Sequence, residues 1–393
     1  MIFPTEALRA LRQSLGAQME AGTLAPPEAF RQALDADPDD FTSITHLIDH
    51  ALTEGHLADA ERLGWELLRT APSSPHSYLM FTTVLERRQP ESKLPMQFLK
   101  LGLELLRHDE DSLEEFEFDQ LLADDTRGLI EGLAKPEALE VVLRGLEQLA
   151  DGAAPPEVVP YRRILALRAA GSGPVERAEV DAILADPVRY VPLLRGILKE
   201  YAEGELIEDT TLVERAITLL GEMGDAAVVR ELGGFFPDDQ LVNPAMWAFW
   251  RIASRRPQEA LDEVRRSLVD AEPLGLFAAA QFLVHLPRTE GQLEALASVL
   301  DGIERVPRGE RSGIISTVLI GLFILDGADS QRAVRLERRY QRMLTKKAQK
   351  QVQDIRDLRR RTGPEAAPSF STTIYDICCT GVPYGDVDDR AEK

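Results

Sequence analysis

The sequence has few cysteines, few aromatic residues and no long apolar run, and each shortage excludes a class of protein. Its 393 residues include only 2 cysteines, so a disulfide framework is excluded and a reducing cytoplasm is the expected location. The longest apolar run, Gly313 to Leu325, is too short to span a bilayer and predicts a buried helix. The first residues lack a basic stretch followed by an apolar one, so we expect no secretory signal.

Basic residues are also scarce relative to acids. The formal net charge is −21, so most of the surface should repel nucleic acid. Aromatic residues make up only 6%, and Leu and Ala dominate the apolar set, which favours helices over sheets. No alternating Val, Ile and Thr run bounded by Asn-Gly or Asp-Gly occurs before residue 370. We therefore expect an all-α protein.

The first hundred residues show a period of 34. Pro38 and Pro72 are 34 residues apart, and each follows one helical stretch and begins another. Between them, Gly55 permits a tight turn and Ala60 lets two helices approach closely. This unit resembles a tetratricopeptide (TPR) repeat, with poorer copies on either side. The resemblance implies a TPR-like domain of paired helices over residues 1–110.

A second period, of 32 residues, appears further along the chain. Five apolar columns persist through three copies, namely Ala216/Ala248/Ala280, Leu220/Ile252/Val284, Val229/Leu261/Leu293, Leu232/Val264/Leu296 and Phe236/Leu268/Leu300. Each unit is two short helices with a turn, and it is similar to a HEAT repeat of the bacterial type that phycobilin lyases also contain. Such a unit cannot bury its apolar face alone, so neighbours should stack into an α-solenoid. The resemblance implies HEAT-like helix pairs over residues 111–362.

Two segments depart from the average charge. Residues 109–125 contain nine acids and no Lys or Arg, and we expect a solvated face or loop there, with docking of a basic partner as the alternative. Residues 331–361 contain 12 Lys or Arg against 3 acids, and their apolar spacing predicts one long basic helix. We expect this helix to cap the stack. Its candidate contact residues are Arg335, Arg338, Arg339, Arg342, Lys346 and Lys347.

The last segment, residues 363–393, reads as a linker followed by apolar and aromatic residues. It contains both cysteines, Cys378 and Cys379, whose adjacency would strain a disulfide between them. We expect this tail to dock on the protein's own helices or to be disordered; a partner-binding motif and redox or metal chemistry are the alternatives. Its candidate contact residues are Tyr375, Cys378, Cys379 and Tyr384.

No catalytic constellation stands out in the sequence. His46 and His50 are four residues apart, as metal ligands on a helix can be, but Leu47 replaces the Glu of a zinc protease motif. No GxSxG or phosphate-binding loop occurs either. We therefore expect no catalytic residue, no metal and no cofactor.

These observations predict a non-catalytic scaffold or adaptor that binds another protein or peptide on its helices. Thr45 and Asp49 on the TPR-like inner face are candidate contacts, and so is Trp247 if it faces outward, whereas Trp250 is expected in the core. One alternative is an RNA- or ribosome-associated factor that acts through residues 331–361, although the acidic charge elsewhere disfavours nucleic acid as a partner. Another is a lyase-like or thiol-dependent enzyme, by analogy with HEAT-type lyases.

Overall fold

The computed structural model of this chain is helical throughout the part that it describes, which is residues 6–107, 143–144, 154–204, 210–236, 238–269, 273–365, 370–381 and 384. Within these ranges no extended strand occurs, which confirms the predicted all-α class there. None of the helices described has the length and apolarity to cross a membrane. The acidic stretch at 109–125 and the predicted boundary at residue 110 lie outside the described residues.

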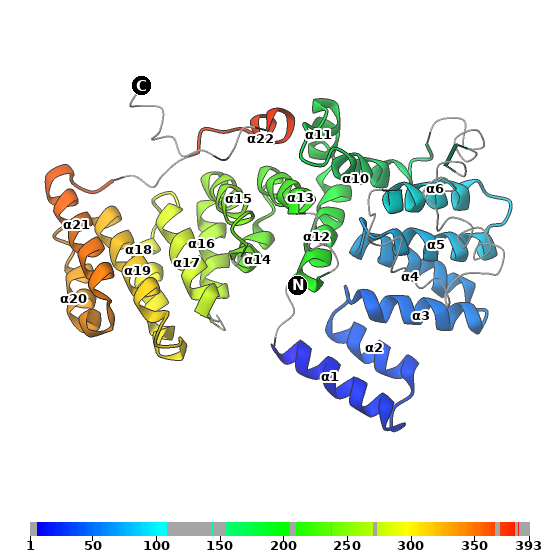
Figure 1. The fold of residues 1–393 in the computed structure, drawn as a ribbon, viewed down its shortest axis with the longest axis horizontal. Helices are drawn as coiled ribbons and strands as arrows, with labels where there is room; N and C mark the ends of the chain where they lie inside the picture. The colour runs from blue at the N-terminus through cyan, green and yellow to red at the C-terminus, as the bar shows by residue number, and fades with distance from the viewer. Residues whose placement is uncertain are drawn as a thin grey trace. The chain divides into compact units, whose positions relative to one another are not determined.

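The chain divides into two compact units, Met1–Ala216 (unit 1) and Ile217–Lys393 (unit 2). Unit 1 begins with six helices that pack on one another in chain order (Figure 1). They are α1 (Glu6–Glu20), α2 (Pro26–Ala36), α3 (Phe41–Thr53), α4 (Leu57–Thr70), α5 (Pro75–Arg88) and α6 (Leu94–Arg107). Later in the unit come α10 (Val159–Ala169), α11 (Arg177–Leu184) and α12 (Pro187–Glu203). Because α12 packs on α4 and α10 on α6, early and late helices share one core.

The helix pair α3–α4 forms as its sequence predicts. Asp40 caps α3 by accepting hydrogen bonds from the backbone and hydroxyl of Ser43. Gly55 has a φ of +74°, the left-handed conformation that the turn between the two helices requires. Ala60 is fully buried where α4 packs on its neighbours. Membership of the tetratricopeptide family stays a prediction.

A second glycine sets the distance between α4 and α12. A Cβ atom at Gly196 would lie 2.3 Å from the carbonyl oxygen of Arg69 and 2.9 Å from that of Thr70. Both are backbone atoms in the last turn of α4, so no side-chain rotation could relieve the contact. Only a residue without a Cβ atom allows α12 to approach α4 this closely.

We expect Gly196→Ala to destabilise unit 1 by about 2–3 kcal/mol, because the two helices must separate to admit the methyl group. Urea denaturation combined with hydrogen–deuterium exchange of α12 peptides measures this loss. Gly16→Ala is the matched control, since a Cβ atom at this α1 position has nothing within 4 Å. That variant should be neutral or stabilised by up to about 1 kcal/mol. Equal stabilities of the two variants would contradict the prediction.

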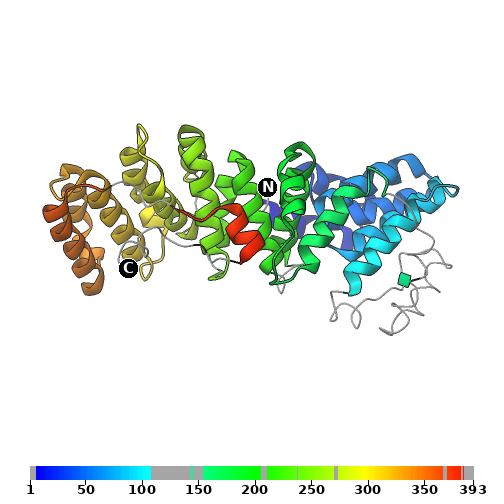
Figure 2. The ribbon, with the colours of Figure 1, turned by 90° about the horizontal axis from the view of Figure 1, so that it is seen from above.

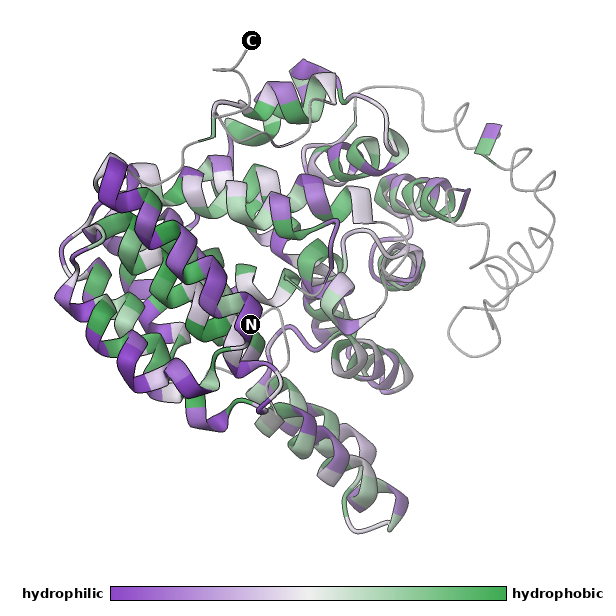
Figure 3. Cartoon of the chain, turned by 60° about the vertical axis from the view of Figure 1, so that its left-hand side comes forward, coloured by the Kyte–Doolittle hydropathy of each residue, from purple (hydrophilic) through white to green (hydrophobic). Residues whose placement is uncertain are grey.

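Unit 2 consists of short helices and 3₁₀ turns. The unit boundary falls within α13 (Thr210–Met223). The following helices are α14 (Val229–Leu232), α15 (Val242–Arg255), α16 (Pro257–Ser267), α17 (Pro273–His285), α18 (Gln292–Ser298), α19 (Arg311–Asp326), α20 (Gln331–Tyr340), α21 (Lys346–Thr362) and α22 (Ile374–Thr380). Figure 3 shows polar and apolar residues interspersed along each helix, the pattern of amphipathic helices.

The predicted 32-residue columns lie mostly in the core. The first column is fully buried at all three positions, Ala216, Ala248 and Ala280. The last column departs from the prediction, because Phe235 and not Phe236 is fully buried. The 3₁₀ turn Gly233–Phe235 precedes Phe236, and its three residues per turn shift the register relative to an α-helix.

The prediction of one long basic helix over residues 331–361 is wrong. α20 ends at Tyr340, the 3₁₀ turn Gln341–Met343 follows, and α21 begins at Lys346. Between them Leu344 is buried with an extended backbone (ψ 133°), and the Thr345 hydroxyl caps α21 by accepting a hydrogen bond from the Ala348 amide. Since α20 and α21 each pack on α19, the break lets both apolar faces be buried.

Candidate functional site

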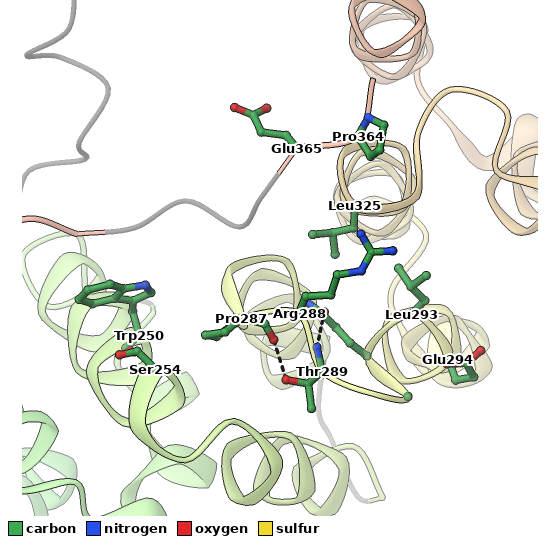
Figure 4. A pocket seen from close by; sticks show the side chains of 12 residues that line it. Trp250, Ser254, Pro287, Arg288, Thr289, Leu293, Glu294, Leu325, Pro364 and Glu365 are labelled. Atoms are coloured by element: carbon green, nitrogen blue, oxygen red, sulfur yellow. Dashed lines mark hydrogen bonds between the residues drawn. The ribbon is translucent and has the colours of Figure 1, made fainter. Parts of the chain in front are cut away.

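Unit 2 contains a groove of about 610 Å³, which lies within the size range of ligand pockets (Figure 4). Several elements contribute to it: α15, the loop between α17 and α18, the start of α18, the end of α19 and the segment after α21. Its lining residues are Trp250, Ser254, Pro287, Arg288, Thr289, Gly291, Gln292, Leu293, Glu294, Leu325, Pro364 and Glu365.

The walls of the groove are largely apolar. Trp250 is half-buried, and its ring centroid lies 5.7 Å from that of Phe370 in the C-terminal tail. Leu293 and Leu325 contribute from α18 and α19. The backbone amide of Glu365 donates a 2.9 Å hydrogen bond to the Ile324 carbonyl, which attaches the segment after α21 to the end of α19. This segment therefore forms part of the groove wall.

The uncharged polar groups of the groove are satisfied by its own backbone. The Ser254 hydroxyl donates to the Trp250 carbonyl at 2.7 Å, and the Thr289 hydroxyl donates to the Pro287 carbonyl at 2.6 Å. Gln292 is 2% exposed, and its amide nitrogen donates to the carbonyl oxygens of Leu283 (2.7 Å) and Leu286 (2.9 Å). These bonds fix the shape of the α17–α18 loop.

The charges of the groove do not balance. Glu294 pairs with Arg332, and this hydrogen bond lowers the pKa of the Glu294 carboxyl below its ordinary value. Glu365 pairs with Arg359. Arg288 is exposed, and no ion pair or hydrogen bond of its side chain is found within the described ranges. The groove therefore carries one uncompensated positive charge.

The C-terminal tail packs on unit 2 next to this groove. The indole nitrogen of Trp247 donates a 3.1 Å hydrogen bond to the Thr372 carbonyl, and the hydroxyls of Tyr384 and Thr218 are 2.6 Å apart. α22 lies beside α13 and α15 (Figure 2), and a Thr373–Asp376 capping box begins it. The described tail residues thus cover part of unit 2, and the groove lies at the edge of the covered surface.

The burial of the two tryptophans is the reverse of the expectation. Trp247, predicted as an outward-facing anchor, is fully buried, because the tail covers α15 at this point and the Tyr384 ring packs 6.3 Å from its own. Trp250, expected in the core, is half-buried and lines the groove. Their exposure depends on tail contacts from more than a hundred residues away in sequence.

The other predicted contact residues are dispersed. On α3, Asp49 is exposed, but Thr45 is only 8% exposed, because both α2 and α4 pack on this helix. In the tail, Cys378 is buried and Cys379 is half-buried. Tyr375 and Tyr384 are half-buried. All six candidate cations are exposed: Arg335, Arg338, Arg339, Arg342, Lys346 and Lys347.

Sequence reasoning missed Arg288 and the groove around it. Arg288 lies in a short loop between two helices, marked only by Pro287 and Gly291. Leu325 and Glu365 reach the same groove from other elements. No local pattern indicates that these residues meet.

A chain that ends at Thr362 should expose Trp247, because it lacks the tail residues that cover the indole. We expect its tryptophan emission to shift to longer wavelength and unit 2 to lose stability, since burial of Ile374, Ile377 and Cys378 is also lost. The same truncation in a Trp247→Phe background is the control; Trp250 also loses its contact with Phe370, so a smaller shift should remain there. An unchanged emission spectrum after truncation would show that the tail does not cover Trp247.

No metal site emerges in the part of the chain that the structure describes, where no group of three or more His, Cys, Asp or Glu side chains could coordinate an ion. The features that remain for a functional proposal are the groove, its charge and the tail beside it. None of the family models, curated proteins or solved structures compared with this chain matches it.

Proposed function

We propose that this protein is a non-catalytic scaffold or adaptor that binds a peptide segment of another protein in the groove of unit 2. The proposal includes a helical-repeat solenoid, with TPR-like pairs followed by HEAT-like pairs. The packing of successive helices in chain order supports the architecture. Stacked helix pairs offer long surfaces for partners.

The observation that carries the proposal is an apolar groove with a half-buried tryptophan in its wall. Tryptophan is enriched at the energetic centres of protein interfaces, where a pocket and a surrounding rim exclude water. The Phe370 ring packs 5.7 Å from that of Trp250 and restricts the positions that the indole can adopt before a ligand arrives. An anchor ordered in advance reduces the entropy cost of binding.

The hydroxyls of the groove support binding over nucleophilic catalysis. A nucleophilic hydroxyl needs an adjacent general base to accept its proton. Here the Ser254 and Thr289 hydroxyls donate to carbonyl oxygens of their own elements, and neither is hydrogen-bonded to a histidine or carboxylate in the described structure.

Selection from a displayed library of random peptides on the full chain tests the proposal. Peptides enriched on the wild type should bind Trp250→Ala at least about tenfold more weakly, as expected for a central anchor. Val269→Ala is the matched control, because Val269 is a 70% exposed apolar residue of unit 2 outside the groove. Enriched peptides that bind Trp250→Ala and wild type equally, or no enrichment at all, would overturn the proposal.

The exposed cations around α20 and α21 support a second candidate, binding of a polyanion such as RNA. Arg338, Arg342, Lys346 and Lys347 are exposed, and no ion pair of theirs occurs among the residues described. Binding through them should weaken steeply with salt. Lys346→Glu combined with Lys347→Glu should then abolish RNA binding, measured by filter retention at two salt concentrations, and unchanged retention would exclude this candidate.

A further inference from the structure

We infer that the groove of unit 2 selects peptides in which an Asp or Glu lies next to a proline or aromatic residue. The carboxylate would pair with Arg288, and the apolar neighbour would pack on Trp250. This inference rests on the proposed function, since it supplies the chemical class of the groove's ligand.

The charge of the groove favours a carboxylate. Both of its acids already have arginine partners outside the groove, Arg332 for Glu294 and Arg359 for Glu365. A basic peptide would therefore meet the positive charge of Arg288 and find no free acid to bind. The chain as a whole is acidic, with a net charge of −21, and other exposed cations without ion pairs in the described structure, such as Arg338 and Lys346, do not line this apolar groove. The groove can therefore distinguish its ligand from other acidic segments, because it requires an apolar neighbour beside the acid as well as the acid itself.

The position of Arg288 suits an ion pair at the groove. Figure 4 shows its side chain extending from the α17–α18 loop toward Leu325 on α19. A guanidinium group presents a planar fork that matches both oxygens of a carboxylate. Because Arg288 is exposed, water screens such a pair, and its main contribution is to the choice of ligand.

The loop that carries Arg288 is ordered before binding. Pro287 restricts the backbone on one side, and on the other side the Thr289 hydroxyl donates back to the Pro287 carbonyl. The buried Gln292 joins this loop to the end of α17 through two donated hydrogen bonds, and it accepts a third from the Thr289 amide at 3.4 Å. A fixed loop loses little entropy when a ligand binds, which favours a specific geometry.

Trp250 is the reason to expect an apolar residue beside the acid of the ligand. Its half-buried ring offers a surface on which a proline or an aromatic side chain can stack. The Arg251 guanidinium lies over the indole ring, with its carbon 5.9 Å from the ring centroid, and the Phe370 centroid lies 5.7 Å away, so a ligand side chain would pack on the part of the ring that these two leave open. Since Arg288 and Trp250 line the same groove, one short peptide segment can contact both.

The test is the same library selection, performed on the full chain in wild-type, Arg288→Gln and Arg288→Glu forms. Wild-type selections should be enriched in Asp or Glu beside Pro, Phe, Tyr or Trp, and individual peptides should bind Arg288→Gln about two- to fivefold more weakly in fluorescence anisotropy. Arg288→Glu should reverse the preference, so that versions with Lys in place of the acid bind better. Arg308→Glu is the matched control, because Arg308 is an exposed loop arginine of unit 2 outside the groove.

The outcomes separate this inference from the proposed function. Peptides that need Trp250 but bind Arg288→Gln as well as wild type, or that lack acids, would overturn the inference and leave peptide binding in place. A similar loss in Arg308→Glu would also overturn it, because the effect would then be one of overall charge. The absence of any Trp250-dependent peptide would overturn both.

Discussion

Asp37→Asn is expected to destabilise unit 1 by about 3–5 kcal/mol, because it removes the carboxylate that pairs directly with a buried lysine. The ammonium nitrogen of Lys199 on α12 lies 2.7 and 2.6 Å from the two carboxylate oxygens of Asp37, which follows α2. Each side chain is only 5% exposed. A neutral amide can accept one hydrogen bond from Lys199 but cannot balance its charge.

Arg12 extends this pair into a network. Its guanidinium lies 3.2 Å from Asp37, 3.4 Å from Asp40 and 3.1 Å from Glu203. Residues from α1, the α2–α3 connection and α12 are therefore joined by charge. Loss of the Asp37 carboxylate should weaken all three contacts together, and so the effect should exceed that of a single surface pair.

Urea denaturation with hydrogen–deuterium exchange of α12 peptides measures the effect of Asp37→Asn. Asp35→Asn is the matched control, since Asp35 is an exposed acid of α2 and its removal should change stability by less than about 0.5 kcal/mol. Adding Lys199→Met to Asp37→Asn should recover part of the loss, because no unpaired charge then remains buried. An Asp37→Asn protein as stable as the Asp35→Asn control would refute the prediction.

Glu200→Gln is expected to remove most of the loss of stability that unit 1 suffers as pH rises. Burial raises the pKa of the Glu200 carboxyl to about 8, although hydrogen bonds from the Ser73 amide (3.2 Å) and hydroxyl (2.6 Å) oppose the shift. Arg168 lies close by and donates a 2.6 Å hydrogen bond to the Ser73 carbonyl. The raised pKa favours the protonated carboxyl in the folded protein at neutral pH.

The direction of the pH effect follows from the raised pKa. The unfolded chain releases the Glu200 proton near pH 4.5, whereas the raised pKa keeps it on the folded protein up to about pH 8. The stability contributed by Glu200 is complete when the pH is below the pKa of the unfolded state. It is lost as the pH rises through the pKa of the folded state. The total is on the order of 4 kcal/mol between about pH 5 and about pH 9.

Two other groups contribute to the pH profile. Burial lowers the pKa of His76 to about 4, so this residue costs stability on the acid side, as pH falls below about 6.5. Burial raises the pKa of Glu203, which adds to the loss on the alkaline side. Glu200→Gln should therefore flatten most of the alkaline limb and leave the acid limb unchanged.

Urea denaturation at a series of pH values tests this expectation. Glu54→Gln, at an exposed acid that follows α3, should keep the wild-type profile. If Glu200→Gln also kept the wild-type slope between about pH 6 and about pH 9, Glu200 would have to be ionised in the folded protein.

The helices themselves could be predicted from the sequence, because the interactions that specify them are local. Gly55 marks the turn between α3 and α4, and the run from Gly313 to Leu325 lies within the buried helix α19. The Ala216, Ala248 and Ala280 column is buried as its period predicts. Each of these signals depends on residues within one helix pair, where spacing translates directly into a shared face.

The contacts that define the candidate site were decided only by the tertiary structure. Asp37 and Lys199 are 162 residues apart, and Trp247 is buried by a tail that lies more than a hundred residues downstream. The charge of Arg288 is uncompensated because the two acids of the groove pair with arginines from other elements. Periodicity shows which face of a helix is apolar, but burial and charge balance depend on what packs against that face. Those partners are specified by the fold as a whole, because contacts between distant segments depend on many helices packing together and not on any single segment.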